Sequence, residues 1–366
     1  MDTSLYLTIA LGAVVAGFVQ GLSGFAFGLV AMSFWAWTVD PKLAAVLATS
    51  GALTGQVIAA VTVRRGFDKA LLLPFVAGGL VGVPVGVWLL PLVDIVIFKT
   101  LLGLLLVLWF VGQPWWLERQ RQARRQVPFP SAWRDVLRQR VALYRILPSH
   151  LQLQLKQHIQ VFLAEKTFIG CNGLEITDEM RVTVAAHACL LILNRPGDYY
   201  PRLRQILLYP DSFVVERDHT DGIGVAHRAR QVLAGESWSQ GQVILSWQDT
   251  LAGAAVADDG QNVAIHEFAH QLDQETGSAN GAPLLARRGQ MQSWSNVLGA
   301  EFATLQARVT RGAPSLFSDY GATDPAEFFA VVSEVFFEQP LPMAQDYPAL
   351  YQQLSEYYQL DPRNWS

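Results

Sequence analysis

His266, Glu267 and His270 form the pattern His-Glu-x-x-His, which holds the strongest candidates for chemistry in this chain. On a helix, positions i and i+4 lie one turn apart on the same face, so the two imidazoles can bind one Zn²⁺ ion. Zinc lowers the pKa of a bound water to about 7, and Glu267 can accept the proton of that water and pass it to a leaving amine. The pattern therefore predicts zinc-dependent hydrolysis of a peptide bond.

A catalytic zinc site needs a third protein ligand and one open position. No third histidine follows His270 at a short spacing, so we expect an acidic ligand further along the chain. The segment Asp319–Pro340 offers Glu327 and Glu334, and Pro325 stands where a helix can begin. The two glutamates are seven residues apart and lie on similar faces of that helix, so position alone leaves both open.

The surrounding sequence predicts the elements that must position these residues. The motif helix is expected to run to Asp273 and to be capped by Asp258 or Asp259. Helices are also expected at Pro148–Leu163 and Asp178–Asn194, and strands at Gln205–Pro210, Phe213–Glu216 and Gln242–Trp247. Helices with a few strands indicate an α+β fold. We expect the last of these strands to pair with an extended peptide substrate by edge addition.

The N-terminal third of the chain has a different composition. Residues 1–116 contain four acidic and five basic residues, whereas the other 250 residues contain 27 and 22. About 20 apolar residues suffice to cross a bilayer as a helix. About four spans are predicted, at Ser4–Val39, Leu43–Val63, Ala70–Val93 and Thr100–Gly112. We therefore expect a transmembrane region at 1–116, a basic, proline-containing linker at 117–132 and a soluble domain at 133–366.

Basic residues predict how the chain is oriented in the membrane. Arg64, Arg65 and Lys69 follow the second span, and four arginines follow the fourth span within residues 119–125. With four spans these two loops lie on the same side, and the positive-inside rule places that side in the cytoplasm. We expect a multi-pass protein of the inner (cytoplasmic) membrane, with the soluble domain in the cytoplasm and the linker arginines against anionic lipid headgroups.

Glycines recur at intervals of about four in the predicted spans. They are Gly17, Gly21, Gly24 and Gly28 in the first span and Gly78, Gly82 and Gly86 in the third. Small residues on one face let helices approach closely, so we expect these glycines to be packing positions. The alternative is that the polar stretch Gln20–Gly24 marks a broken helix, which is the feature that transporters use for ion sites.

The membrane region resembles one repeat of the TauE/SafE sulfite-exporter family. The resemblance covers about residues 1–116 and rests on GFVQGLSGFAFGLVAMSFWAW followed by PKLAAVLATSGALTGQ. Members of that family usually carry two such repeats, whereas this chain has one. The resemblance therefore implies a half-transporter, which would need a second copy of the repeat, supplied by a homodimer, to form a full exporter.

The soluble part resembles the Mlc titration factor A family of zinc-dependent peptidases. The likeness runs over residues 140–362 and is clearest in HEFAHQLD and in YGATDPAEFFAVVSEVFFEQP. The same arrangement also resembles the catalytic domain of lethal-factor-type toxins. These resemblances imply a zincin-like (gluzincin) fold, with His266, His270 and Glu327 as the zinc ligands, Glu267 as the base and Tyr320 beside the site.

Several neighbours of the site keep two interpretations. Tyr320 either donates its hydroxyl to the developing oxyanion or is a packed tyrosine. Asp273 either holds a ligand imidazole or forms a surface salt bridge. Glu334 is expected to support the site or the fold. The other histidines weighed are expected in the core or on the surface: His150, His158, His187 and His227.

The leading prediction is a membrane-anchored zinc peptidase that acts on a peptide or protein substrate. One alternative is a module that binds a transcriptional repressor of the Mlc type, with proteolysis secondary. Another is the half-transporter, regulated by its soluble domain. The net charge of −4 says little about partners. Direct binding of nucleic acid is not expected, because no basic stripe lies on a recognisable reading module.

Overall fold

The computed structural model describes residues 3–23, 26–62, 69–89, 94–195, 197–220, 226–233, 235–238, 241–285 and 289–365. The chain divides into two compact units, Met1–Leu117 and Glu118–Ser366. Arg64, Arg65 and Gly24, which entered the predictions of topology and packing, lie outside the described residues.

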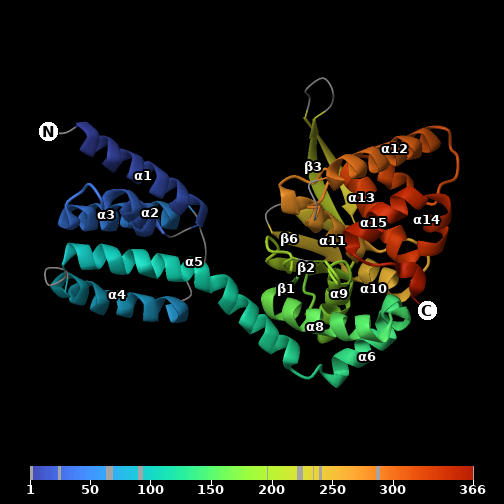
Figure 1. Ribbon diagram of the computed structural model, residues 1–366, viewed down its shortest axis with the longest axis horizontal. Coiled ribbons are helices and arrows are strands. Elements are labelled where there is room, and N and C mark those ends of the chain that lie inside the picture. The colour runs from blue at the N-terminus through green and yellow to red at the C-terminus, as the bar shows by residue number, and fades with distance from the viewer. Residues whose placement is uncertain are drawn as a thin grey trace. The chain divides into compact units, whose positions relative to one another are not determined.

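The N-terminal unit is helical (Figure 1). Its helices are α1 (Thr3–Ser23), α2 (Phe27–Trp35), α3 (Pro41–Thr62), α4 (Lys69–Leu89) and α5 (Ile95–Gln126). Three of them are long and apolar enough to cross a membrane in the described residues, within Ser4–Gly21, Pro41–Ala59 and Val96–Gln126. In α4 the described apolar stretch is the shorter Ala77–Gly86.

The charge-free run Ser4–Val39 does not form a single span. Helix α1 ends at Ser23, and Ala26 adopts a left-handed conformation with φ of 77° before α2 begins. A left-handed residue cannot continue a right-handed helix. With nine residues, α2 is about 14 Å long and too short to cross a bilayer. The helix ends within the polar stretch Gln20–Gly24, as the alternative interpretation of that stretch predicted.

Close packing in the N-terminal unit uses other glycines than those predicted. A Cβ atom added to Gly12 would lie 2.3 Å from the ring of Trp35, and one added to Gly51 would lie 2.2 Å from the ring of Phe27. By contrast, a Cβ at Gly17, Gly21, Gly28, Gly78, Gly82 or Gly86 would meet nothing within 4 Å. Among the described residues, these glycines are therefore not packing positions.

The C-terminal unit contains a four-stranded sheet in the order β1-β2-β6-β5. Its strands are β1 (Thr167–Gly170), β2 (Gln205–Tyr209), β5 (Gly235–Trp238) and β6 (Gln242–Ser246). β1, β2 and β6 are parallel, whereas β5 runs antiparallel to β6. The strand expected to bind substrate at an edge is β6, which is interior, so that prediction is wrong. Among the described strands, β5 forms this edge of the sheet.

A separate antiparallel hairpin of β3 (Phe213–Thr220) and β4 (Ala226–Leu233) extends away from the sheet in Figure 1. The side chain of His227 lies outside the described part of this hairpin. The expected strands at 205–210, 213–216 and 242–247 correspond to β2, the start of β3 and β6.

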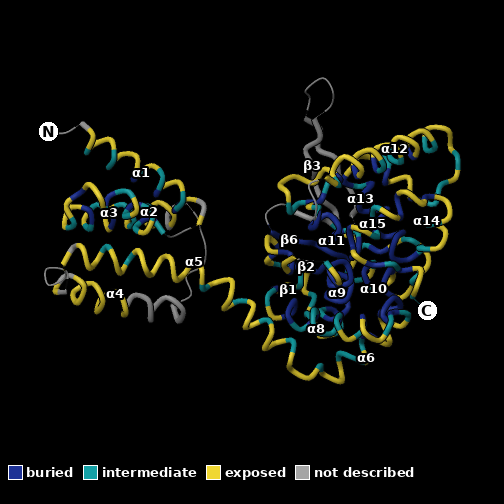
Figure 2. Tube along the Cα trace, in the orientation of Figure 1, coloured by how far each residue is buried: buried dark blue, intermediate teal, exposed yellow. Residues whose placement is uncertain are grey.

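Helices surround the sheet and enclose the core. They are α6 (Ser131–Arg140), α7 (Ala142–Ile146), α8 (Ser149–Glu165), α9 (Asp178–Leu190), α10 (Trp247–Ala255), α11 (Val263–Asp273), α12 (Gln290–Thr310), α13 (Pro325–Glu338), α14 (Pro340–Asp346) and α15 (Pro348–Tyr358), with the short η2 (Gln274–Thr276), η3 (Asp319–Ala322) and η4 (Pro362–Asn364). Helices α9, α11 and α13 are buried almost throughout (Figure 2). The core therefore holds the motif helix on several sides.

The end of α5 belongs to the C-terminal unit and contacts it directly. Arg121 pairs with Glu165 and Asp198, and its side chain is only 11% exposed. Arg125 pairs with Glu118 and donates to the Tyr199 hydroxyl. These two arginines were expected to contact lipid headgroups, but their charges are instead paired with carboxylates of this unit.

Candidate metal centre

Helix α11 carries the His-Glu-x-x-His pattern on a well-defined frame. Asn262, rather than Asp258 or Asp259, caps the helix, because its Oδ1 accepts a hydrogen bond from Ile265 N at 3.1 Å. Asp259 instead accepts from Gln261 N in the preceding turn. The apolar side of α11 is fully buried at Ile265, Phe268, Ala269 and Leu272. This burial fixes the rotation of the helix and turns both histidines of the pattern to the same side.

Helix α13 begins as the sequence predicted, with Pro325 in its first turn. Asp324 caps it by accepting from Ala326 N at 2.9 Å and from Glu327 N at 3.0 Å. Because α13 packs against α11, Glu327 and Glu334 both face the motif helix.

Three side chains meet between these two helices. Nε2 of His266 lies 2.9 Å from Oε2 of Glu327, and Nε2 of His270 lies 3.3 Å from the same oxygen. The two Nε2 atoms are 3.2 Å apart. Atoms held about 2.0–2.1 Å from a tetrahedral zinc ion are themselves roughly 3.3 Å apart. These residues therefore fit a zinc ion bound by two nitrogens and one oxygen.

Glu334 contacts the opposite side of the His266 ring. Its Oε1 lies 2.8 Å from Nδ1 of His266, and its Oε2 accepts from Asn262 N at 2.5 Å. A carboxylate on Nδ1 fixes the orientation of the ring and leaves Nε2 for a metal. The two glutamates that position alone left open thus occupy different places, with Glu327 in the three-residue cluster and Glu334 behind it.

The carboxylates control the charge of this cluster. Burial by itself would lower the pKa of His266, but hydrogen bonds with Glu327 and Glu334 outweigh it and raise that pKa well above its usual value. Burial would likewise raise the pKa of Glu327, but hydrogen bonds from His266 and His270 lower it. The two carboxylates therefore favour positive charge on these imidazoles, which is the environment that a bound cation needs.

Glu267 is buried beside the cluster and is packed against the edge strand. A Cβ atom added to Gly235 of β5 would lie 2.6 Å from Oε1 of Glu267 and 2.8 Å from Val263. Only glycine permits this approach of strand to helix. Sequence reasoning did not identify Gly235, because its role depends on the tertiary contact between β5 and α11.

Tyr320 lies on η3 at the rim of the same site. Its ring centroid is 5.9 Å from that of His266, and the residue is 42% exposed. It shares a cavity of about 1130 Å³ with His266, Glu267, His270 and Glu327. An exposed tyrosine at the mouth of a cavity can reach a bound molecule, which a tyrosine packed in the core cannot.

Of the two interpretations of Asp273, the surface salt bridge is wrong, because the residue is fully buried. Among the described residues, Asp273 also makes no hydrogen bond to a ligand imidazole. Its Oδ2 accepts from Asn280 N at 2.8 Å and from Gly281 N at 2.7 Å, which anchors the loop after η2 to the end of α11.

His187 lies in the core, where its Nδ1 is hydrogen-bonded to Thr183 O, and burial lowers its pKa to about 4.

His158 bonds to the Tyr199 hydroxyl at 2.7 Å, away from the cluster. Burial, helped by the charge of Arg125, lowers its pKa to about 4. His150 is exposed, as one of the two expectations allowed.

Comparison with known proteins now identifies the family. Residues 115–359 match the model of the glucose-regulated metallo-peptidase M90 family, which is more than half of the chain. The chain belongs to the M90 family. Residues 9–143 match the sulfite exporter TauE/SafE model. Both resemblances found in the sequence are confirmed, and membership of M90 implies a metal, which is generally zinc.

Curated relatives match more than half of this M90 chain. An uncharacterized protein of Synechocystis sp. is 40% identical over 268 residues, which is 73% of this chain and 97% of that protein. Mlc titration factor A of Klebsiella pneumoniae (strain 342) is 37% identical over 214 residues, or 58% and 80% of the two chains. The protein of the same name in Serratia proteamaculans is 35% identical over 235 residues, which is 63% of this chain and 88% of that protein.

The TauE/SafE match and the three apolar helices indicate a membrane protein.

Proposed function

We propose that this protein is a membrane-anchored zinc peptidase of zincin-like (gluzincin) fold, with His266, His270 and Glu327 as its metal ligands. The observation that supports this most is the convergence of two Nε2 atoms and one carboxylate oxygen within 3.3 Å of one another. Two facing imidazole nitrogens cannot both donate to each other, but both can bind one cation.

Bound zinc would supply Lewis acidity, which polarises the scissile carbonyl and makes a water molecule acidic enough to attack it. Glu267 has the place of the general base: it is buried, faces the cavity and follows His266 directly on α11. Its carboxylate takes the proton of the attacking water and later delivers a proton to the leaving amine. Tyr320 donates its hydroxyl to the carbonyl oxygen as negative charge develops there.

The substrate is a peptide or protein segment in extended form. Strand β5 is the edge strand, and Gly235 brings it against Glu267. A peptide that pairs with β5 by backbone hydrogen bonds would run past the catalytic glutamate. This replaces the interior strand β6 as the proposed substrate-binding strand.

We further propose that the apolar helices anchor the peptidase in the inner (cytoplasmic) membrane as a multi-pass protein, with the C-terminal unit in the cytoplasm. In this proposal the membrane region ends at residue 116, the linker covers residues 117–132 and the peptidase begins at residue 133.

A second candidate function is capture of an Mlc-type repressor, favoured by relatives called Mlc titration factor A that are 35–37% identical. A half-transporter that dimerises through its membrane repeat is a further candidate, from the TauE/SafE match.

The proposal is tested on the full chain purified in detergent. We expect about one zinc per chain by elemental analysis, and cleavage of peptides from a fluorogenic library that a chelator abolishes. Glu267→Gln should keep the zinc and lose the cleavage. A wild-type protein that binds zinc but cleaves none of the peptides, while retaining a purified Mlc-type repressor, would favour the capture function instead.

A further inference from the structure

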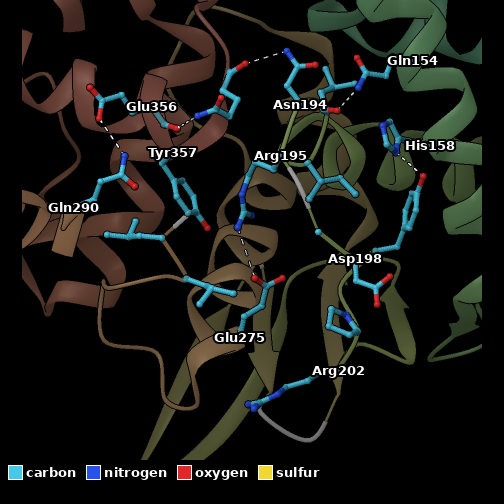
Figure 3. Close-up of a pocket in the computed structure, with 18 of the residues that line it drawn as sticks. Gln154, His158, Asn194, Arg195, Asp198, Arg202, Glu275, Gln290, Glu356 and Tyr357 are labelled. Carbon is cyan, nitrogen blue, oxygen red and sulfur yellow. Dashed lines mark hydrogen bonds and ion pairs between the residues drawn. The ribbon is translucent and has the colours of Figure 1, made fainter. Parts of the chain in front are cut away.

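A second large cavity, of about 1170 Å³, lies within the C-terminal unit (Figure 3). Its walls come from the end of α5, from α8, from the segment that links α9 to β2, from η2, and from α12 and α15. Among the described residues, no lining residue is shared with the cavity of the metal centre. The peptidase mechanism therefore makes no use of this space.

Arg195 lies at the centre of this cavity in Figure 3. Its side chain is only 9% exposed, and its guanidinium stacks on the ring of Tyr357 at 4.3 Å. The nearest carboxylate, on Glu275, is 3.7 Å away, which is longer than a hydrogen bond. A guanidinium has five N–H donors, and burial without acceptors is costly for so many. Arg195 therefore has one ion-paired carboxylate, on Glu275, for its five N–H donors, and an anionic ligand would supply further acceptors.

Other charges near the cavity do not supply these further acceptors. Asp198 pairs with Arg121, and Glu356 accepts from Gln352 and Gln290. Burial raises the pKa of Glu275, and the charge of Arg195 beside it acts in the opposite direction. Among the described carboxylates, Glu275 alone thus opposes the charge of Arg195.

The rest of the wall is rich in side-chain amides. Gln157 and Gln353 make no hydrogen bond to the described residues, so their amides are available to a ligand. Leu284 is 61% exposed and offers an apolar surface to a carbon skeleton. Amides that both donate and accept suit hydroxyl groups, and a cavity of about 1170 Å³ has room for a small molecule.

We propose that this cavity binds a small organic anion that carries hydroxyl groups, with its carboxylate or phosphate on Arg195 and its hydroxyls on the amides of Gln157 and Gln353. Arginine matches such anions because its planar fork makes two parallel hydrogen bonds. The site adjoins the metal helix, because Glu275 lies in η2 directly after α11 and Arg202 donates to Gln274 O at 3.0 Å.

The test titrates three probes into the full chain in detergent and follows binding by calorimetry. Glucose 6-phosphate and gluconate carry an anionic group, and sorbitol is the uncharged control. We expect at least one anion to bind about 10-fold more tightly than sorbitol or better, since a charged hydrogen bond contributes that much. Whichever anion binds more tightly identifies the group that Arg195 holds. Equal affinities for all three probes, or no binding, would overturn the proposal.

Variants locate the site. Arg195→Gln should weaken binding of the anion at least about 10-fold and leave sorbitol unchanged, whereas Arg181→Gln, outside the cavity, should change neither. Arg195→Lys keeps the positive charge but loses the planar guanidinium, so its affinity for the anion should lie between those of wild type and Arg195→Gln. If Arg195→Gln does not fold, Arg195→Lys is the variant that tests the site. An Arg195→Lys or Arg195→Gln protein that binds the anion as wild type does would show that the ligand lies elsewhere. The calorimetric affinity depends neither on zinc content nor on peptide cleavage. Its outcome is therefore independent of the peptidase proposal.

Discussion

Helices approach closely by different means in the two units of this protein. In the N-terminal unit, Gly12 lets α1 pack against the ring of Trp35, and Gly51 lets α3 pack against the ring of Phe27. A missing side chain makes room for a large one. Such contacts depend mainly on shape and dispersion, and the hydrogen bonds beside them run to backbone carbonyls, from Trp35 Nε1 to Ile9 O at 3.2 Å and from Gln20 Nε2 to Ala52 O at 3.1 Å.

In the C-terminal unit, α11 and α13 meet through buried polar groups. Glu334 accepts from His266 and from Asn262 N, and Glu338 accepts from the Asn262 side chain at 2.9 Å. Glu327, Glu334 and Glu338 follow one another along one face of α13. Hydrogen bonds specify direction as well as distance, so this contact orients an imidazole ring, which a glycine contact cannot do.

The largest expected effect is on peptide cleavage, from a change at Glu267 on α11 beside the polar contact with α13. Glu267→Gln keeps the size of the side chain but cannot accept a proton near neutral pH. Peptide cleavage should fall about 10²–10⁴-fold while zinc stays at about one per chain. His266→Ala should lose zinc and cleavage together. Near-normal turnover by the glutamine variant, measured on the same peptide, would rule out Glu267 as the base.

A smaller loss is expected where the edge strand touches the base. Gly235→Ala places a methyl group against Glu267 and Val263, so the carboxylate must shift. Cleavage should fall about 100-fold, because small misplacements of a catalytic group have effects of this size, and zinc content should not change. Gly299→Ala on α12 is the control, since its methyl group meets nothing within 4 Å. Equal activities of the two variants would show that the strand tolerates the shift.

Because Glu334 orients the ring of His266, removing this contact should lower the affinity for zinc. Glu334→Gln replaces one of the two acceptor oxygens with a donor, and zinc should bind about 10–100-fold more weakly. Glu327→Ala should weaken binding further, because it removes a proposed ligand. Glu301→Gln, on α12, is the matched control. Competition with a chelator gives the affinities, and a stronger loss in Glu334→Gln than in Glu327→Ala would exchange the two assigned roles.

The sequence predicted the candidate site better than its surroundings. The motif fixed which residues share a helix face, and Pro325 indicated where α13 begins. Asn262 and Gly235 were missed because their roles depend on tertiary contacts with α13 and with α11. The interior place of β6 was missed because β5 follows a hairpin and returns antiparallel, which no local pattern records.

In the membrane unit the apolar runs were visible, and the break after Ser23 was one of two interpretations of Gln20–Gly24, but the packing glycines were not visible. Gly51→Leu should destabilise the unit by about 1–3 kcal/mol, because the ring of Phe27 occupies the space. Gly82→Leu should cost much less, since nothing lies within 4 Å. Denaturation of the full chain in detergent, followed by tryptophan fluorescence, compares them. If Gly82→Leu destabilised the protein more than Gly51→Leu, the predicted glycine face of α4 would be a packing face after all, for instance between two copies of the chain.

The smallest expected effect is the pH response of Glu338. Burial raises its pKa from 4.5 to about 8, and the nearby carboxylates Asp259 and Glu334 add to the increase. The folded unit therefore holds a proton on Glu338 that the unfolded chain releases above pH 4.5. Its contribution to the free energy of unfolding is complete below about pH 4.5 and is lost as the pH rises to about 8.

Glu338→Gln mimics the protonated form and cannot ionise, so it should reduce this dependence. Between pH 5 and pH 8 the unfolding temperature of the zinc-loaded wild type should fall by at least about 2–4 °C more than that of the variant. Subtracting the two curves removes groups that titrate in both proteins. Parallel curves would mean that Glu338 is ionised across this range, and that the α11–α13 contact tolerates a buried charge beside Asn262.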